Sequence, residues 1–134
     1  MSVVKRVLAM LLLVFACKDP YDFEPGDPNK PNPPAAPALR SPADGYNTET
    51  YVYPQDVELT WYPVERAEFY QVRVYRDSLL QHLVAANDRA RAVSMVFSLS
   101  FGQYYWRVRA ASRQWNNYTD WSVTWRFIVP SPAR

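Results

Sequence analysis

Few side chains in this sequence could carry out covalent or acid–base chemistry. Cys17 is the only cysteine and His82 the only histidine, and no group of residues has the spacing of a metal site. Glu65 and Glu68 are close in the sequence, but carboxylates that flank a turn are usually solvated charges rather than an acid–base pair. With only three glycines, the chain lacks a glycine-rich phosphate loop. The sequence therefore predicts a protein that is not an enzyme and needs no cofactor or metal.

Cys17 stands at the end of a segment with the three parts of a secretory signal. Lys5 and Arg6 form its basic start, and residues 7–15 form an apolar run far shorter than the roughly 20 residues of a membrane-spanning helix. Residues 14–17, Val-Phe-Ala-Cys, resemble the bacterial lipobox, which implies lipidation of Cys17. An ordinary signal peptide with an incidental cysteine is the alternative. We expect residues 1–17 to be a lipoprotein signal peptide that places the protein in the bacterial cell envelope, as an outer-membrane lipoprotein that is periplasmic or surface-exposed.

The charge balance of the expected mature chain is even. Lys5 and Arg6 leave with the signal peptide, so 13 basic side chains remain against 13 acidic ones. A chain without net charge has no general attraction to nucleic acid, and we do not expect nucleic acid as a partner.

Residues 18–38 hold seven of the 12 prolines and show neither a strand nor a helix period. Proline fixes φ and removes a backbone donor, so such a segment stays extended and semi-rigid. We expect a disordered, proline-rich spacer that reaches on the order of 65 Å at about 3.1 Å per residue. It would separate a domain formed by residues 39–134 from the membrane.

The domain from residue 39 onward consists of short runs in which apolar and polar side chains alternate. The longest is residues 102–111, and alternation over this length is typical of a half-buried β-strand. Residues 79–93 could also line one face of a helix, but consistency with the other runs favours a strand. We expect an all-β, seven-stranded antiparallel sandwich, with strands at 39–45, 57–61, 70–75, 79–85, 95–99, 102–111 and 123–129.

Three motifs in these runs resemble the fibronectin type III pattern. They are Leu59-Thr60-Trp61, Ala67-x-x-Tyr70-x-Val72-x-Val74, and Leu99-x-x-Gly102-x-Tyr104-x-Trp106-x-Val108-x-Ala110. The resemblance covers about residues 39–129, and the lack of paired cysteines suits it better than a disulfide-bonded immunoglobulin domain. It implies that Trp61 is the core tryptophan of the second strand. It also implies that Tyr104 is a tyrosine-corner residue whose hydroxyl bonds to backbone upstream.

The first candidate surface is a row of arginines on one sheet. All eleven basic residues after Ala38 are arginines. Guanidinium groups suit carboxylates and phosphates, so this surface could bind an anionic partner such as an acidic glycan or a lipopolysaccharide phosphate. Alternatively, an arginine–tyrosine ladder merely covers the sheet and keeps it soluble. The residues that strand parity places on this solvent face are Arg73, Arg107, Arg109 and Arg126, with Gln71, Tyr75 and Tyr105.

Residues 121–125, Trp-Ser-Val-Thr-Trp, partly resemble the W-S-x-W-S motif of cytokine receptors, where tryptophans interleave with arginines. In those type III domains the ladder of arginines and aromatic rings covers one sheet. The match here is incomplete, and it supports the ladder interpretation only in part.

The second candidate surface is the end of the sandwich where we expect the loops 62–68, 86–91 and 112–120 to meet. Trp115 and Tyr118 in the last loop could stack on a sugar ring or contact a protein. Alternatively, Trp115 folds back and caps the core. The spacer should enter at this end, and the carboxy terminus should lie at the opposite end.

Together these features predict a lipid-anchored cell-envelope module for binding or scaffolding. It would attach to the membrane through its N-terminal lipid and act on an envelope protein by protein–protein interaction, without catalysis. The alternative is a carbohydrate-binding accessory lipoprotein that recognises envelope or extracellular glycans.

Overall fold

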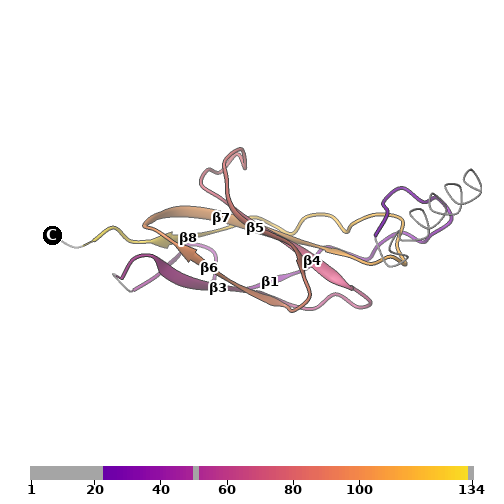
Figure 1. Cartoon of the computed structure of the whole chain (residues 1–134), viewed down its shortest axis with the longest axis horizontal. Coiled ribbons are helices and arrows are strands. Elements are labelled where there is room, and N and C mark those ends of the chain that lie inside the picture. Colours follow the sequence, from indigo (N-terminus) through magenta and orange to yellow (C-terminus); the bar gives the residue numbers. More distant parts are fainter. Residues whose placement is uncertain (1–22, 50–51, 133–134) are drawn as a thin grey trace, which may run out of the picture.

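The computed structural model describes residues 23–49 and 52–132. The predicted signal peptide, the lipidation site Cys17, and the ends of the expected spacer and domain (residues 18–22 and 133–134) lie outside the described residues. Within the described ranges, no helix is long and apolar enough to cross a membrane. The strands of the described chain are β1 (Leu39–Ser41), β2 (Tyr46–Asn47), β3 (Gln55–Trp61), β4 (Phe69–Tyr75), β5 (Leu83–Ala90), β6 (Ser94–Leu99), β7 (Gly102–Ala111) and β8 (Trp125–Val129) (Figure 1).

These strands form two sheets, in the orders β1-β3-β6 and β2-β8-β7-β4-β5. Neighbouring strands are antiparallel except for β2 and β8, which run parallel. Because successive strand side chains point to opposite faces, β3 and β7 each present every second residue to the space between the sheets. The expected all-β sandwich is confirmed. The fully buried side chains at its centre include Leu59, Trp61, Val72, Val74, Trp106, Val108 and Phe127.

The described residues contain one strand more than the seven predicted, because the first predicted run, 39–45, is a strand only at Leu39–Ser41 and a second short strand follows directly after it at Tyr46–Asn47. β1 pairs with β3, whereas β2 pairs with β8 in the other sheet. Pro42 lacks a backbone donor, and Gly45 has a φ of +83° that other residues rarely adopt. The chain therefore leaves the first sheet at Pro42 and turns at Gly45 into the second.

Several strand boundaries also differ from the prediction, and β3, for example, begins at Gln55 rather than residue 57. The fourth predicted strand, 79–85, is instead β5 at Leu83–Ala90, and the helical alternative for residues 79–93 is wrong. A turn occupies the preceding residues, in which the Asp77 carboxylate accepts the backbone N–H groups of Gln81 and His82. The last strand begins at Trp125 rather than residue 123.

Both residue roles implied by the fibronectin type III resemblance are confirmed. Trp61 is 1% exposed and packs edge-to-face against Tyr70, with ring centroids 5.5 Å apart. The Tyr104 hydroxyl donates to the Ser100 carbonyl at 2.8 Å, which closes the tyrosine corner. Gly102 has a φ of +152°, a conformation that favours glycine, and it lets β7 begin directly beneath the Tyr104 ring.

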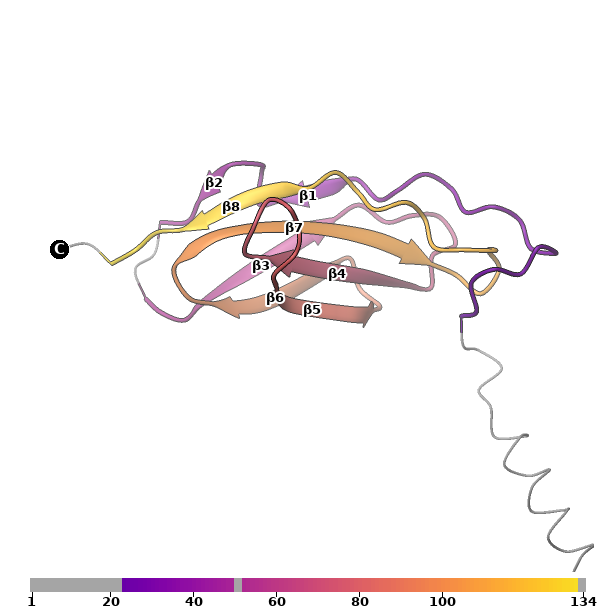
Figure 2. The ribbon, with the colours of Figure 1, turned by 90° about the horizontal axis from the view of Figure 1, so that it is seen from above.

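Residues 23–38, the described part of the expected spacer, lie against the domain instead of standing free of it (Figure 2). The Gly26 N–H donates to the Asn116 carbonyl at 2.6 Å, and the Asn116 N–H donates to the Pro31 carbonyl at 2.8 Å. Pro37 is buried. This segment differs from a disordered spacer because its proline rings cover the Trp115 side chain and its Pro31 carbonyl accepts a hydrogen bond from the domain. The two ends of the sandwich differ accordingly: this segment joins one end, and β8 ends at the other (Figure 2).

Candidate binding surfaces

The first surface, which we call the arginine face, lies on the outer side of β4 and β7. Arg73 on β4 pairs in register with Arg107 on β7, and Gln71 pairs with Arg109. The neighbouring residues Val72 and Val108 point inward and are fully buried. Because strand side chains alternate, all three arginines share the outer face, as their parity predicts.

An aromatic side chain, Trp121, occupies the centre of the arginine face. Its ring centroid lies 4.2 Å from the Cζ of Arg107, 4.4 Å from that of Arg109 and 5.4 Å from that of Arg73. Tyr118 stacks on Arg109 at 3.8 Å. Tyr75 contacts Arg107 at 5.5 Å. Cations and rings therefore alternate across the face, an arrangement in which each guanidinium is held by the ring beside it.

Two hydroxyl residues attach the segment that carries Trp121 to β7. Ser122 donates its N–H to the Val108 carbonyl at 2.8 Å, and its Oγ accepts the Val108 N–H at 2.9 Å. Thr119 does the same with Ala110, at 3.0 and 2.9 Å. The hydroxyl oxygens of Ser122 and Thr119 thus accept the β7 N–H groups that backbone carbonyls of a paired strand would otherwise accept. Regular pairing with β7 therefore begins only at Trp125, where β8 starts.

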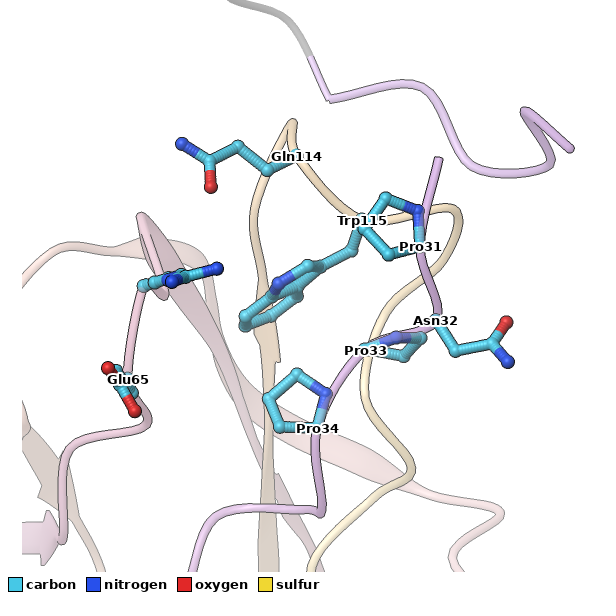
Figure 3. Close-up of a pocket in the computed structure, with 8 residues that line it drawn as sticks. Pro31, Asn32, Pro33, Pro34, Glu65, Gln114 and Trp115 are labelled. Carbon is cyan, nitrogen blue, oxygen red and sulfur yellow. The ribbon is translucent and has the colours of Figure 1, made fainter. Parts of the chain in front are cut away.

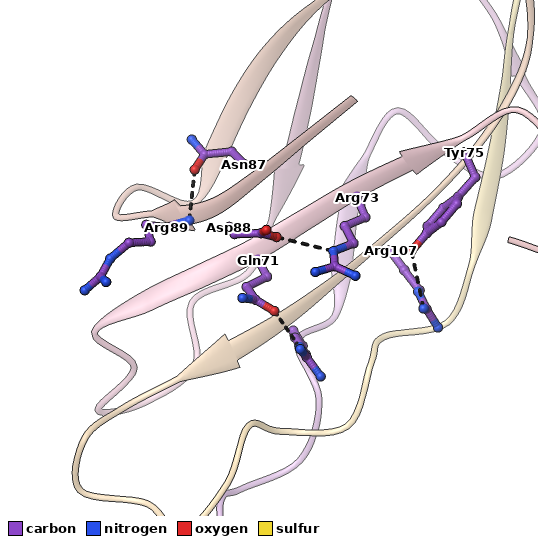
Figure 4. A network of polar contacts seen from close by, with 8 residues as sticks. Gln71, Arg73, Tyr75, Asn87, Asp88, Arg89 and Arg107 are labelled. Carbon is purple, nitrogen blue, oxygen red and sulfur yellow. Dashed lines mark hydrogen bonds and ion pairs between the residues drawn. The ribbon is translucent and has the colours of Figure 1, made fainter. Parts of the chain in front are cut away.

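The arginines are fixed by hydrogen bonds as well as by stacking. Arg73 Nε pairs with the Asp88 carboxylate at 3.3 Å, Arg109 Nε donates to Gln71 Oε1 at 2.7 Å, and Arg107 Nη2 donates to the Tyr75 hydroxyl at 3.4 Å. Figure 4 shows these contacts. They use one N–H of each guanidinium, and an arginine carries five. Arg107 Nε is buried without a hydrogen-bond partner, so a carboxylate would reach this guanidinium through its Nη groups.

The charges of the arginine face influence one another. Burial and repulsion from Arg73 and Arg107 lower the pKa of Arg109, although Tyr118 opposes the shift. Burial also lowers the pKa of Arg73, but the hydrogen bond and the charge of Asp88 outweigh it and raise that pKa overall. Arginine stays protonated at physiological pH in either case. Asp88 therefore compensates one of three positive charges.

Two predicted members of this surface lie beside the stack. Arg126 on β8 pairs in register with Tyr105 on β7, and its backbone N–H donates to Asp44 at 2.8 Å. The Tyr105 hydroxyl reaches Gln103 at 3.4 Å. The structure thus brings together Arg73, Arg107, Arg109, Tyr75 and Tyr118, but Tyr75 and Gln71 are buried and do not face solvent as predicted. Trp121 was not among the predicted site residues, although the pattern of residues 121–125 already contained its signal.

The second surface, the loop end near residues 112–120, is largely covered. Trp115 is 4% exposed and belongs to the core cluster, as the capping alternative predicts. Pro31, Pro33 and Pro34 surround its ring (Figure 3). An open cavity of about 420 Å³ lies alongside, next to Arg66. Trp115 is therefore not available as a stacking platform for a sugar.

A carboxylate from the neighbouring loop fixes the shape of this loop end. Glu68 accepts the Arg113 N–H at 2.7 Å and forms an ion pair with the Arg113 guanidinium at 3.1 Å. The Ser112 hydroxyl donates to the same carboxylate at 3.2 Å. Glu68 is thus a structural anchor, unlike the solvated charge that its sequence position predicts. Among the residues that the structure describes, no three acidic, histidine or cysteine side chains are grouped to hold a metal ion.

Comparison with solved structures identifies the fold. A fibronectin type III-like protein from Clostridium thermocellum superposes with a TM-score of 0.52 at 19% identity, covering 77% of this chain and all of that one. The fibronectin(III)-like modules of Clostridium thermocellum CbhA give 0.49 at 11% identity, covering 72% and 99%. A β-1,2-glucanase from Parabacteroides distasonis gives 0.46 at 19% identity, covering 75% of this chain and 14% of that chain. No protein-family model matches the sequence, and no curated protein matches it.

The strand order, the tyrosine corner and the first of these likenesses establish a fibronectin type III fold.

Proposed function

We propose that this chain is a lipid-anchored module of the bacterial cell envelope that binds a protein partner through the arginine face and carries out no catalysis. One observation carries the proposal. Among the described residues, three partly buried guanidinium groups are held in fixed positions around Trp121, and the Asp88 carboxylate pairs with one of them, that of Arg73. An acidic surface on a partner protein fits this arrangement.

The composition of the face supports a protein partner. Arginine, tryptophan and tyrosine are the residues that contribute most often to the energetic centre of protein interfaces. Stacking on Trp121 and Tyr118 also orders the arginine side chains before any partner arrives. Binding then loses less side-chain entropy, which raises affinity for the same number of contacts.

The lipid anchor rests on the sequence pattern at Cys17. Loss of the signal peptide and attachment of acyl chains at this residue would tie the chain to the membrane, because two or more chains suffice for stable anchoring. Intact-mass measurement of membrane-extracted protein should find a chain that begins at Cys17 and carries lipid. A chain that retains Met1, or carries no lipid, would contradict this part of the proposal.

A capture experiment tests the arginine face. Full-length protein in detergent is used to capture envelope proteins, and the same is done with an Arg107→Gln/Arg109→Gln variant. The matched control is Arg40→Gln/Arg91→Gln, which removes the same charge from other exposed positions. We expect the face variant to lose a specific partner that the control retains. Equal capture by both variants would remove the arginine face from the proposal.

The carbohydrate alternative has less support, because Trp115 lies beneath proline rings at the loop end. The carbohydrate alternative is then limited to an acidic glycan that binds the arginine face. A glycan array with specific, saturable hits that the face variant loses would favour it over a protein partner.

A further inference from the structure

Residues 23–38, which we call the strap, contact loop 112–120 at several points and the rest of the domain at others. At its start, the Phe23 ring lies 4.5 Å from Tyr118 and 6.1 Å from Phe69, edge-to-face in both cases. At its end, the Ala38 carbonyl accepts the Tyr62 N–H at 2.9 Å, which leads the chain into β1. The strap is therefore bound to the domain at both of its described ends.

Asn116 is the centre of the strap contact. Its backbone carbonyl accepts the Gly26 N–H, and its backbone N–H donates to Pro31. Its side-chain amide donates to Asn32 Oδ1 at 2.6 Å. Beside it, Pro31, Pro33 and Pro34 cover the Trp115 ring (Figure 3). Proline-rich segments bind aromatic surfaces in this way with little loss of entropy, because proline is already extended.

The strap also ends beside the arginine face. Phe23 contacts Tyr118, and Tyr118 stacks on Arg109, so the first described residue lies at one edge of the proposed binding surface. A cavity of about 350 Å³, lined in part by Phe23 and Arg89, lies at this edge. Whatever precedes Phe23 in the chain must start from this edge.

Docking of the strap shortens the distance between the anchor and the domain. Phe23 follows Cys17 by only six positions in the sequence. An extended chain spans at most about 3.3–3.6 Å per residue, so this stretch reaches roughly 20 Å. A free spacer from Cys17 to the domain would have reached on the order of 65 Å at about 3.1 Å per residue.

We propose that the strap holds loop 112–120 next to the membrane, so that the arginine face serves a partner protein whose acidic surface lies at the bilayer. This rests on the lipid anchor of the proposed function. The kind of partner follows from the reach: a membrane-embedded or membrane-bound protein with carboxylates near the headgroups. A partner deep in the periplasm or far outside the cell would not meet the face.

The first test measures strap docking in the full-length protein. NMR hydrogen exchange at the backbone N–H of Gly26 and Asn116 is compared between the wild type and a Phe23→Ala/Asn32→Ala variant. The control is Asn29→Ala, an exposed strap residue whose side chain faces no loop residue in the described contacts. We expect exchange at least about 10-fold faster in the double variant and unchanged in the control. Equal exchange in all three proteins would overturn the docked strap.

The second test measures height above the bilayer. In the lipidated full-length protein, a fluorophore is placed by Asn117→Cys in loop 112–120 or by Gln103→Cys near the start of β7, and acceptor lipids are added. β7 has ten residues and so spans about 30 Å at about 3.3 Å per residue. We expect strong transfer from position 117 and weak transfer from position 103, with both becoming weak in the Phe23→Ala/Asn32→Ala variant. Weak transfer from position 117 in the wild type would overturn the proposal.

The two tests separate failure of the strap from failure of the anchor. A protein that does not associate with vesicles lacks the anchor, and the inferred height is then wrong even where exchange shows a docked strap. A protein that associates with vesicles but shows fast exchange at Gly26 and Asn116 retains the anchor and lacks the strap.

Discussion

At the scale of single residues, the arginines of the binding face were predictable and their central aromatic partner was not. Arg73, Arg107 and Arg109 share strand parity with their neighbours, so period-two alternation alone assigns them to one face. Trp121 lies outside any strand, and its place depends on hydrogen bonds from Ser122 to β7. Periodicity carries no information about such a segment, and only the partial motif at residues 121–125 pointed to it.

Trp121 should contribute to stability through its arginine contacts. Replacement by Ala removes three cation–π contacts, each worth about 0.5–1 kcal/mol at exposed sites. We expect the free energy of unfolding, measured by urea denaturation, to fall by about 1.5–3 kcal/mol. The control is Tyr62→Ala, which removes a single contact with Arg40 at 5.8 Å. Losses of equal size in both variants would show that the arginine stack adds nothing.

Tyr104 should make stability depend on pH under alkaline conditions. Burial raises the pKa of its hydroxyl above the ordinary value of 10.0, although Arg76 opposes the shift. The folded state therefore holds this proton more tightly than the unfolded state. The resulting stabilisation is fully present below pH 10 and is lost as the pH rises through the folded-state pKa.

Tyr104→Phe checks this dependence. At pH 8 the variant should lose about 1 kcal/mol, the usual contribution of one hydrogen bond, here that to Ser100. Between pH 10 and 12, urea denaturation should show the wild type losing its advantage over Tyr104→Phe. A difference that stays constant over this range would show that Tyr104 has the same pKa in the folded and unfolded protein.

At the scale of elements, the sequence predicts a strand correctly where the alternation of apolar and polar residues is long. It misplaces a strand where a turn sets the residue at which that strand begins. The boundaries of β7 match the expected 102–111 run. β5 begins later than predicted because Asp77 accepts N–H groups from the residues that would have opened the strand. Side chains that bind their own backbone compete with strand pairing, and a hydrophobic pattern cannot show which interaction wins.

The segment that follows β7 should depend on its two buried hydroxyls. Ser122→Ala leaves the Val108 N–H without its acceptor in a buried position, and an unsatisfied buried donor costs about 1–3 kcal/mol. We expect a loss of this size in the free energy of unfolding, with faster hydrogen exchange at Val108. Thr124→Ala, at an exposed position of the same segment, should change neither quantity. Normal protection of Val108 in Ser122→Ala would contradict the proposed role.

At the scale of the whole molecule, composition gave the wrong expectation for residues 23–38. Proline content predicts an extended chain, but residues 25–30 of the strap form turns and only residues 31–38 are free of them. It does not predict whether the chain stands free, because docking depends on a surface built from residues far away in sequence, here Trp115 and Asn116. The same proline rings that indicate a spacer can equally cover an aromatic residue. The folded unit is therefore the sandwich together with its strap.

This view predicts the outcome of removing the strap. A chain of residues 39–134 loses the backbone hydrogen bonds at Asn116 and the cover of Trp115, while it no longer has to order the strap, which partly offsets the loss. We expect the net loss in the free energy of unfolding to be about 1–2 kcal/mol. For a domain of this size each kcal/mol lowers Tm by about 4–8 °C, so the Tm of the shorter chain should be roughly 5–15 °C below that of residues 23–134. Acrylamide should also quench tryptophan emission more strongly in the shorter chain, and Trp115→Phe should abolish that difference. Equal Tm and equal quenching in the two chains would mean that the sandwich is complete without the strap.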